Sequence, residues 1–146
     1  MKNKMIITRN SNETEKLGEK MGENLKGGEI LALVGDLGGG KTTFVRGLAK
    51  GLGCKEIPKS PSFVLMNIYN CPNRLKLVHL DLYRLESDGE IESVGVEDYL
   101  GKKDCVSVIE WAEKGKEIIP KNAVWIRFEY VNKNKRKIEI NYDLRN

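Results

Sequence analysis

The order of apolar and polar positions at the start of the chain predicts a strand followed by a helix. Residues 4–9 alternate weakly between apolar and polar side chains, as a strand with one buried face does. Ser11 is a favourable N-cap residue, and after it apolar side chains recur every four residues on one helical face, at Leu17, Met21 and Leu25. We expect this helix to end at the glycine pair 27–28.

A buried strand and a second helix are predicted next, joined by a glycine-rich loop. Residues 29–34 form an apolar run of the kind found in strands that are buried on both faces. Beyond the glycines, the apolar face of an amphipathic helix comprises Phe44, Val45, Leu48, Ala49 and Leu52. A strand, a glycine loop and a helix therefore follow one another between residues 29 and 53.

Two pairs of apolar runs, each pair separated by a short polar turn, predict two hairpins in the rest of the chain. The first pair covers residues 63–69 and 75–82, and the second covers residues 124–131 and 137–142.

Between the hairpins, residues 105–110 predict a further strand, and the acidic segment 86–100 predicts short helices. Strands that alternate with helices at the front and hairpins further on favour the α/β class, with a mixed sheet covered by helices on both faces.

Composition narrows this picture to one domain that does not enter a membrane. A chain of 146 residues with 40% hydrophobic residues matches a single domain over residues 1–146. Charged residues make up 32% of the chain, and no apolar run is long enough to cross a bilayer. The basic N-terminus is not followed by an apolar segment of secretory length, so we expect a soluble protein of the cytoplasm.

Cysteines and net charge point to no special chemistry. Cys54, Cys71 and Cys105 are widely spaced, odd in number and never form a Cys-x-x-Cys pair, which argues against zinc sites and disulfides and predicts reduced, structural thiols. The net charge of +4 is mild. Lys133, Lys135, Arg136 and Lys137 form a basic cluster that we interpret as a solvated turn, with contact to RNA phosphates as the alternative.

The glycine loop carries the clearest chemical pattern in the chain. Its sequence fits Gly-x-x-x-x-Gly-Lys-Thr with Gly35, Asp36, Leu37, Gly38, Gly39, Gly40, Lys41 and Thr42. Glycines let successive backbone N–H groups turn inward and hold phosphate oxygens at the N-terminus of the following helix. Lys41 is expected to reach the β- and γ-phosphates of ATP, and the Thr42 hydroxyl is expected to bind Mg²⁺.

Such a loop needs a further carboxylate at the end of a neighbouring strand, and two residues compete for that place. Asp81 ends the run 75–80, and Glu110 ends the run 106–109. Both strand ends are expected to face the ligand crevice, so the pattern by itself does not rank them.

Three other features have a functional and a structural interpretation. Residues 60–63, Ser-Pro-Ser-Phe, are either a switch segment that senses the γ-phosphate or an ordinary turn. His79, the only histidine, is either a catalytic base or a packing residue, and the second is more usual in a strand. Trp111 packs in the core or against a nucleotide or partner.

Taken in order along the chain, these residues resemble the TsaE family of P-loop ATPases. The resemblance rests on four stretches: 35–43, 60–63, His79-Leu80-Asp81-Leu82-Tyr83-Arg84, and Glu110-Trp111. It implies a P-loop NTPase-like fold and a role in making threonylcarbamoyladenosine in tRNA with the TsaD and TsaB proteins, with tRNA contacted only indirectly.

The resemblance also implies residue roles. Thr42 and Glu110 are expected to bind Mg²⁺, Asp81 to support hydrolysis beside Lys41 and Glu110, and Thr14 to lie near the nucleotide base. The predicted ATP contacts are Thr14, Gly35, Asp36, Leu37, Gly38, Gly39, Gly40, Lys41, Thr42, Thr43, Ser60, Asp81 and Trp111.

Two other classes of protein share the P-loop. A small-molecule kinase would need an acceptor site and an arginine-bearing lid, for which the chain leaves little room. A non-hydrolysing module, in which ATP only stabilises a docking conformation, is the second alternative. Acceptor-dependent phosphate transfer identifies the first, and absence of multiple-turnover phosphate release identifies the second.

Overall fold

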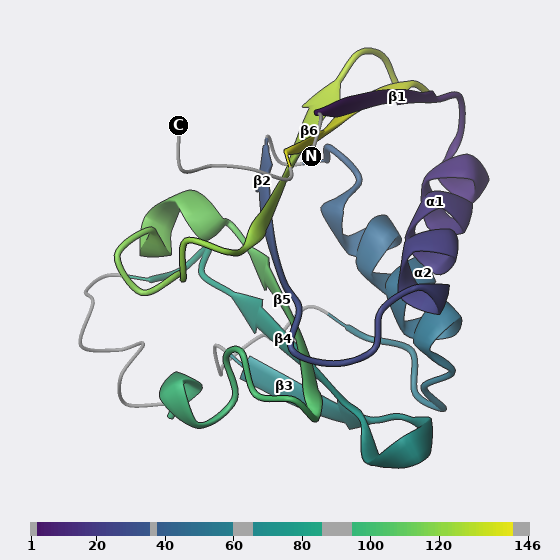
Figure 1. The fold of residues 1–146 in the computed structure, drawn as a ribbon. Helices are drawn as coiled ribbons and strands as arrows, with labels where there is room; N and C mark the ends of the chain where they lie inside the picture. Colours follow the sequence, from purple (N-terminus) through teal and green to yellow (C-terminus); the bar gives the residue numbers. More distant parts are fainter. Residues whose placement is uncertain (1–2, 36–37, 60–65, 86–94, 142–146) are drawn as a thin grey trace.

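The described strands form one mixed sheet (Figure 1). The computed structural model describes residues 3–35, 38–59, 66–85 and 95–141. Its sheet has the order β1-β7-β6-β2-β5-β4-β3. The strands are β1 (Lys4–Thr8), β2 (Ile30–Gly35), β3 (Met66–Asn70), β4 (Lys76–Asp81), β5 (Cys105–Glu110), β6 (Val124–Tyr130) and β7 (Arg136–Asn141). The helices are α1 (Ser11–Glu23) and α2 (Lys41–Leu52), with 3-10 turns η1 (Pro72–Arg74), η2 (Val96–Asp98) and η3 (Ala112–Gly115).

The four central strands β6, β2, β5 and β4 run parallel, and the outer strands pair antiparallel. Both predicted hairpins are confirmed, as β3–β4 and β6–β7. Because β2, β4 and β5 are parallel, their carboxyl ends meet at one edge of the sheet. That edge brings together Gly35, Asp81 and Glu110, and the last two are register partners.

The first helix is confirmed, but both of its ends differ from the sequence prediction. Asn10 is the N-cap rather than Ser11, because its extended backbone (φ −162°) lets its side chain accept a 2.8 Å hydrogen bond from the Glu13 N–H. At the other end the helix stops at Glu23 instead of continuing to Gly27–Gly28. The Asn24 side chain donates to the Lys20 carbonyl and provides the cap that ends the helix earlier.

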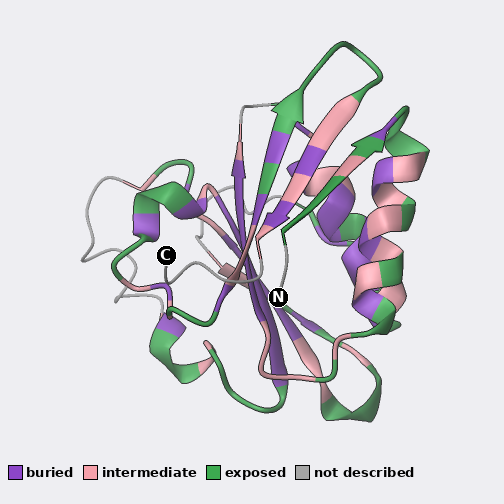
Figure 2. Cartoon of the chain, turned by 45° about the horizontal axis from the view of Figure 1, so that its top comes forward, coloured by how far each residue is buried: buried purple, intermediate pink, exposed green. Residues whose placement is uncertain are grey.

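Each face of the sheet has its own apolar cluster and cover, as the burial pattern in Figure 2 shows. On one face α1 and α2 pack over Leu31, Leu33 and Phe128. On the other face, η2 and η3 contribute Val96 and Ala112 to a cluster with Ile30, Ala32 and Leu80. Helices thus cover both faces as predicted, with α-helices on one and 3-10 turns on the other. In the part of the chain that the structure describes, no helix is long and apolar enough to span a bilayer.

The two α-helices cross at the distance of backbone contact, and glycines make this possible. A Cβ atom placed on Gly47 would lie 1.9 Å from the Glu15 carbonyl oxygen, and one on Gly18 would lie 2.2 Å from that of Phe44. Gly22 and Gly51, one turn further along each helix, meet the opposite backbone in the same way. The repeated Gly-x-x-x-Gly spacing therefore fixes how α2, whose N-terminus carries Lys41 and Thr42, sits against α1.

Replacing Gly47 with alanine is expected to lower the free energy of unfolding by about 1–3 kcal/mol, the usual cost of overpacking. Without crowding, replacing a helical glycine with alanine stabilises a protein by up to about 1 kcal/mol. A lower free energy of unfolding therefore requires that the added Cβ atom is crowded by α1. Denaturant unfolding measures the change. Lys20→Ala on the exposed face of α1 is the control and should stay within about 0.5 kcal/mol of the parent. A Gly47→Ala protein that is more stable than the parent would contradict the close crossing.

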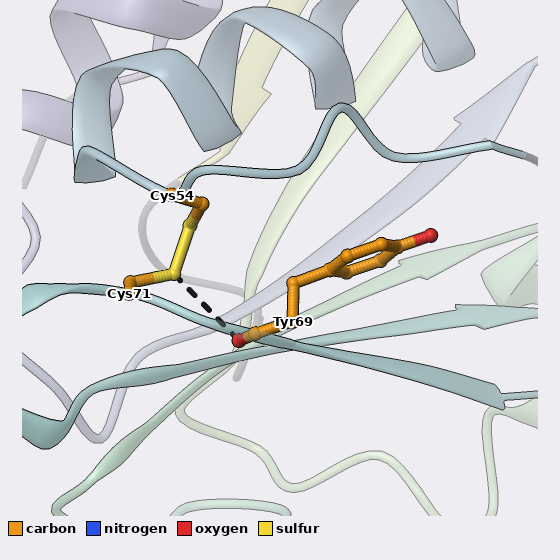
Figure 3. Close-up of a disulfide and its surroundings, with 3 residues drawn as sticks. All are labelled: Cys54, Tyr69 and Cys71. Carbon is orange, nitrogen blue, oxygen red and sulfur yellow. Dashed lines mark hydrogen bonds between the residues drawn. A yellow bond between two sulfur atoms is a disulfide. The ribbon is translucent and has the colours of Figure 1, made fainter.

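The cysteine prediction is wrong for two of the three thiols. Cys54, just after α2, and Cys71, just after β3, form a disulfide (Figure 3). The sequence separation of 17 residues gave no sign of the pairing. The turn after β3 packs under the end of α2, so that a Cβ on Gly53 would lie 3.2 Å from the Pro72 ring, and this brings the two cysteines together. Cys105 is free and buried, as predicted.

Candidate nucleotide-binding site

The loop between β2 and α2 has the backbone that a phosphate cradle requires. Gly35, Gly38 and Gly40 have φ values of 136°, 80° and 101°, a region that residues with a side chain rarely adopt. No described side chain caps the N-terminus of α2, and backbone N–H groups at a helix N-terminus favour an anion. The predicted contacts Asp36, Leu37 and Ser60 lie outside the described residues.

Lys41 lies at the mouth of this cradle. Its side chain is 5% exposed, and its Nζ donates a 2.5 Å hydrogen bond to the Gly35 carbonyl oxygen. The same Nζ lies 3.7 Å from the centre of the Trp111 ring, which provides a cation–π contact. Trp111 follows Glu110 directly and has a positive φ of 56°, which turns the chain at the end of β5. Trp111 therefore contacts the lysine of the cradle and is not only a core packing residue.

Thr42, which is half-buried, and the buried Glu110 and His79 form a polar chain beneath the loop. The Thr42 hydroxyl donates a 3.2 Å hydrogen bond to Oε1 of Glu110. The other carboxylate oxygen of Glu110 lies 2.6 Å from Nε2 of His79, and both side chains are almost fully buried. His79 is thus neither isolated nor a simple packing residue, because it holds the carboxylate of Glu110 in place.

The Thr42–Glu110 pair fits a magnesium ion bound together with phosphates. One hydroxyl and one carboxylate oxygen, 3.2 Å apart, are oxygen ligands of the type that Mg²⁺ prefers. Among the described residues there is no group of three or more His, Cys, Asp or Glu side chains that could hold a metal without phosphates. Magnesium in phosphate sites commonly has only one or two protein ligands, so this donor set is sufficient.

Asp81 lies at the same sheet edge, with different contacts. Its carboxylate accepts a 3.0 Å hydrogen bond from the Tyr83 N–H. Burial, and to a smaller extent the neighbouring charge of Glu110, raise the pKa of Asp81 above its ordinary value, although the Tyr83 hydrogen bond opposes this shift. The geometry therefore distinguishes the two carboxylates that the strand pattern left unranked: Glu110 contacts Thr42, and Asp81 lies on the neighbouring strand end.

On the opposite side of the cradle, Thr14 and Arg136 pack against the loop. A Cβ on Gly40 would lie 3.4 Å from the Thr14 methyl group and 3.7 Å from the Arg136 side chain. Thr14 is buried and forms a 2.7 Å hydrogen bond with the Thr8 hydroxyl. Thr14 thus adjoins the predicted phosphate site, and Thr43 is half-buried in the first turn of α2.

Arg136 is a site residue that sequence interpretation missed. We interpreted it as part of a solvated basic turn, but its Nε donates a 3.0 Å hydrogen bond to the Gly38 carbonyl oxygen, and its guanidinium lies over the Tyr130 ring. Strand alternation could have identified Arg136 as a residue that faces the loop. It lies on the same face of β7 as Ile138 and Ile140, which pack in the cluster below α1 and α2.

Arg136→Ala is expected to weaken ATP binding by about 10- to 150-fold, because a hydrogen bond from a charged group contributes about 1.5–3 kcal/mol and here holds Gly38 in its cradle conformation. Isothermal titration with ATP and Mg²⁺ measures the change. Lys137→Ala, the next residue in the same strand, is the matched control and should bind like the parent. Equal affinities of the Arg136 and Lys137 variants would show that Arg136 does not support the loop.

A mixed α/β sheet in which a strand, a glycine cradle and a Lys-Thr helix start follow one another defines the P-loop class of proteins. Within that class the chain belongs to the TsaE family, threonylcarbamoyl adenosine biosynthesis protein TsaE, whose sequence model matches residues 8–138. The resemblance inferred from the motifs is confirmed.

Relatives and a solved structure agree with this assignment. The chain is 37% identical over 139 residues to the tRNA threonylcarbamoyladenosine biosynthesis protein TsaE of Aquifex aeolicus, covering 94% of this chain and 95% of that protein. It is 40% identical over 111 residues to the protein of the same name from Haemophilus influenzae, covering 76% and 68% of the two chains. The crystal structure of Bacillus subtilis YdiB superposes with a TM-score of 0.77 at 32% identity, covering 95% of this chain and 84% of that one.

Proposed function

We propose that this protein binds ATP with Mg²⁺, hydrolyses it, and acts with TsaD and TsaB in forming threonylcarbamoyladenosine in tRNA. The observation that carries the proposal is the 3.2 Å contact between the Thr42 hydroxyl and the Glu110 carboxylate, at the start of a helix with no described side-chain cap. The names of the relatives support the pathway, and a cytoplasmic location is proposed with it.

The residues of the site have distinct tasks in this proposal. The backbone N–H groups at the start of α2 hold phosphate oxygens, and Lys41 exchanges the Gly35 carbonyl for the β- and γ-phosphates. Thr42 and Glu110 would hold Mg²⁺, which would neutralise developing charge on the phosphates. His79 orients Glu110 through the 2.6 Å contact, and Asp81 supports hydrolysis from the neighbouring strand end.

Multiple-turnover phosphate release with ATP and Mg²⁺ tests the proposal. Release of several equivalents per protein supports an ATPase. A single bound equivalent without release would identify the non-hydrolysing module, and phosphate transfer that depends on an added acceptor would identify the kinase.

Variants of the two carboxylates are expected to separate their roles. Thr42→Ala and Glu110→Gln should weaken ATP binding in Mg²⁺ more than binding in a chelator, because both act through the metal. Asp81→Asn should keep nucleotide affinity and lose turnover. Dissociation constants with and without Mg²⁺, together with phosphate release, provide the comparison. Equal loss of Mg²⁺-dependent affinity in Asp81→Asn and Glu110→Gln would overturn the division of roles.

A further inference from the structure

A second cavity lies on the face of the sheet opposite α1 and α2. Its volume is about 700 Å³, which is within the size range of small-ligand sites. Strand alternation builds its base, because Trp125 and Arg127 point to this face of β6 while Ile126 and Phe128 pack on the other. The segment after η3 forms one wall. We call this cavity, defined by Trp111, Trp125, Lys116, Lys121, Arg127 and Ile119, the β6 cleft.

The β6 cleft combines flat aromatic surface with a cationic rim. Trp111 and Trp125 are half-buried and line it, while Ile119 is 7% exposed and closes its apolar base. Lys116, Lys121 and Arg127 are exposed at its edge, and among the described lining residues the one acid is the exposed Glu113. Sites for single-stranded nucleic acid combine aromatic rings, on which bases stack, with cationic side chains that contact the phosphates.

The same features argue against other occupants. Sites for free small molecules enclose most of the ligand and fix it with a few well-placed polar groups, whereas the cations here stand exposed on the rim. Exposed lysines and arginines suit the phosphates of a strand that continues past the cleft. An acidic peptide would satisfy those cations but would not use the two tryptophans.

From this combination we infer that the β6 cleft binds a single-stranded segment of RNA, with one base against Trp125 and phosphates at Lys121 and Arg127. The site is separate from the ATP contacts on the side of Thr14 and Arg136. Among the described residues it adjoins the cradle through Gly35 and through Trp111, whose ring also contacts Nζ of Lys41.

Fluorescence anisotropy of a labelled pentauridylate, with the nucleotide site filled by ADP and Mg²⁺, tests this inference. Trp125→Ala is expected to weaken binding by about 5- to 100-fold through lost stacking, and Trp125→Phe is expected to retain most of the affinity. Lys121→Glu should weaken binding and reduce the slope of log affinity against log salt by about 0.7 or more, since each phosphate contact contributes about that amount in single strands.

A matched charge reversal and two competitors make the test specific. Lys16→Glu changes the same charge at an exposed position of α1, on the other face of the sheet, and should bind like the parent. Equal weakening by Lys16→Glu and Lys121→Glu would overturn the inference, as would no saturable binding at low salt. Uridine monophosphate binding as tightly as the pentamer would assign the cleft to a free nucleotide instead. Displacement of the pentamer by hexaglutamate but not by unlabelled RNA would assign it to an acidic peptide.

Because ADP occupies the P-loop throughout, the result is independent of the proposed ATPase activity. Lys121 is exposed and makes none of the contacts described for the nucleotide site, so its variant remains informative even if Trp125→Ala is poorly folded.

Discussion

Lys41→Ala is expected to weaken ATP binding by about 10- to 150-fold, because the charge-assisted contact with the phosphates contributes about 1.5–3 kcal/mol. The fold is expected to survive, because the substitution removes the Nζ contact with the Gly35 carbonyl oxygen and no side chain of either apolar cluster. Titration calorimetry of the variant with ATP and Mg²⁺ provides the measurement, with circular dichroism to confirm folding.

The same helix offers the control. Lys50→Ala removes an exposed lysine that pairs with Glu15 at 3.2 Å, far along α2 from the cradle, and should leave the ATP dissociation constant unchanged. A folded Lys41→Ala protein with the parent dissociation constant would show that the loop is not the phosphate site.

TsaD and TsaB together are expected to raise steady-state ATP hydrolysis by about a thousandfold, the order of effect of an arginine supplied to a phosphoryl-transfer site. The described site holds the proposed Mg²⁺ ligands and a lysine, but Arg46 is exposed on α2 and Arg84 is exposed beyond β4. Asp81 is engaged with the Tyr83 backbone. A partner surface that repositions one of these groups, or that supplies its own arginine, would complete the site.

Phosphate release by the protein alone, with each partner and with both, measures the acceleration. Glu110→Gln should remain slow in all four mixtures. Turnover of the lone protein at about 1–100 per second, the rate of typical kinases, and unchanged by the partners, would refute partner activation.

The sequence predicted the strand–loop–helix unit and both hairpins because these depend on local periodicity and on glycines with defined backbone requirements. Gly35, Gly38 and Gly40 were recognisable from spacing, and their positive φ angles explain that spacing. The rank of Glu110 over Asp81 came from the family resemblance and not from the local pattern, because both end parallel strands and only the packing of α2 against the sheet decides which carboxylate meets Thr42.

Two causes account for the other misses, long-range proximity for Arg136 and local capping for the ends of α1. Arg136 reaches Gly38 across 98 positions of sequence, and the turn composition around it resembles an ordinary solvated loop. The ends of α1 differ from the predicted ends because Asn10 and Asn24 act as caps in place of neighbouring residues. Side-chain hydrogen bonds of this kind depend on the local backbone conformation and not on the apolar periodicity.

The disulfide makes residues 54–71 a closed ring of chain that includes the whole segment 60–63. In the chain-entropy account, a ring of this size restricts the unfolded protein by about 3 kcal/mol. It also tethers both flanks of that segment, one to the end of the helix that starts at Lys41 and the other to β3. Purification with thiol reductant and purification in air are therefore expected to yield two chemically different proteins, and phosphate release should be measured on each.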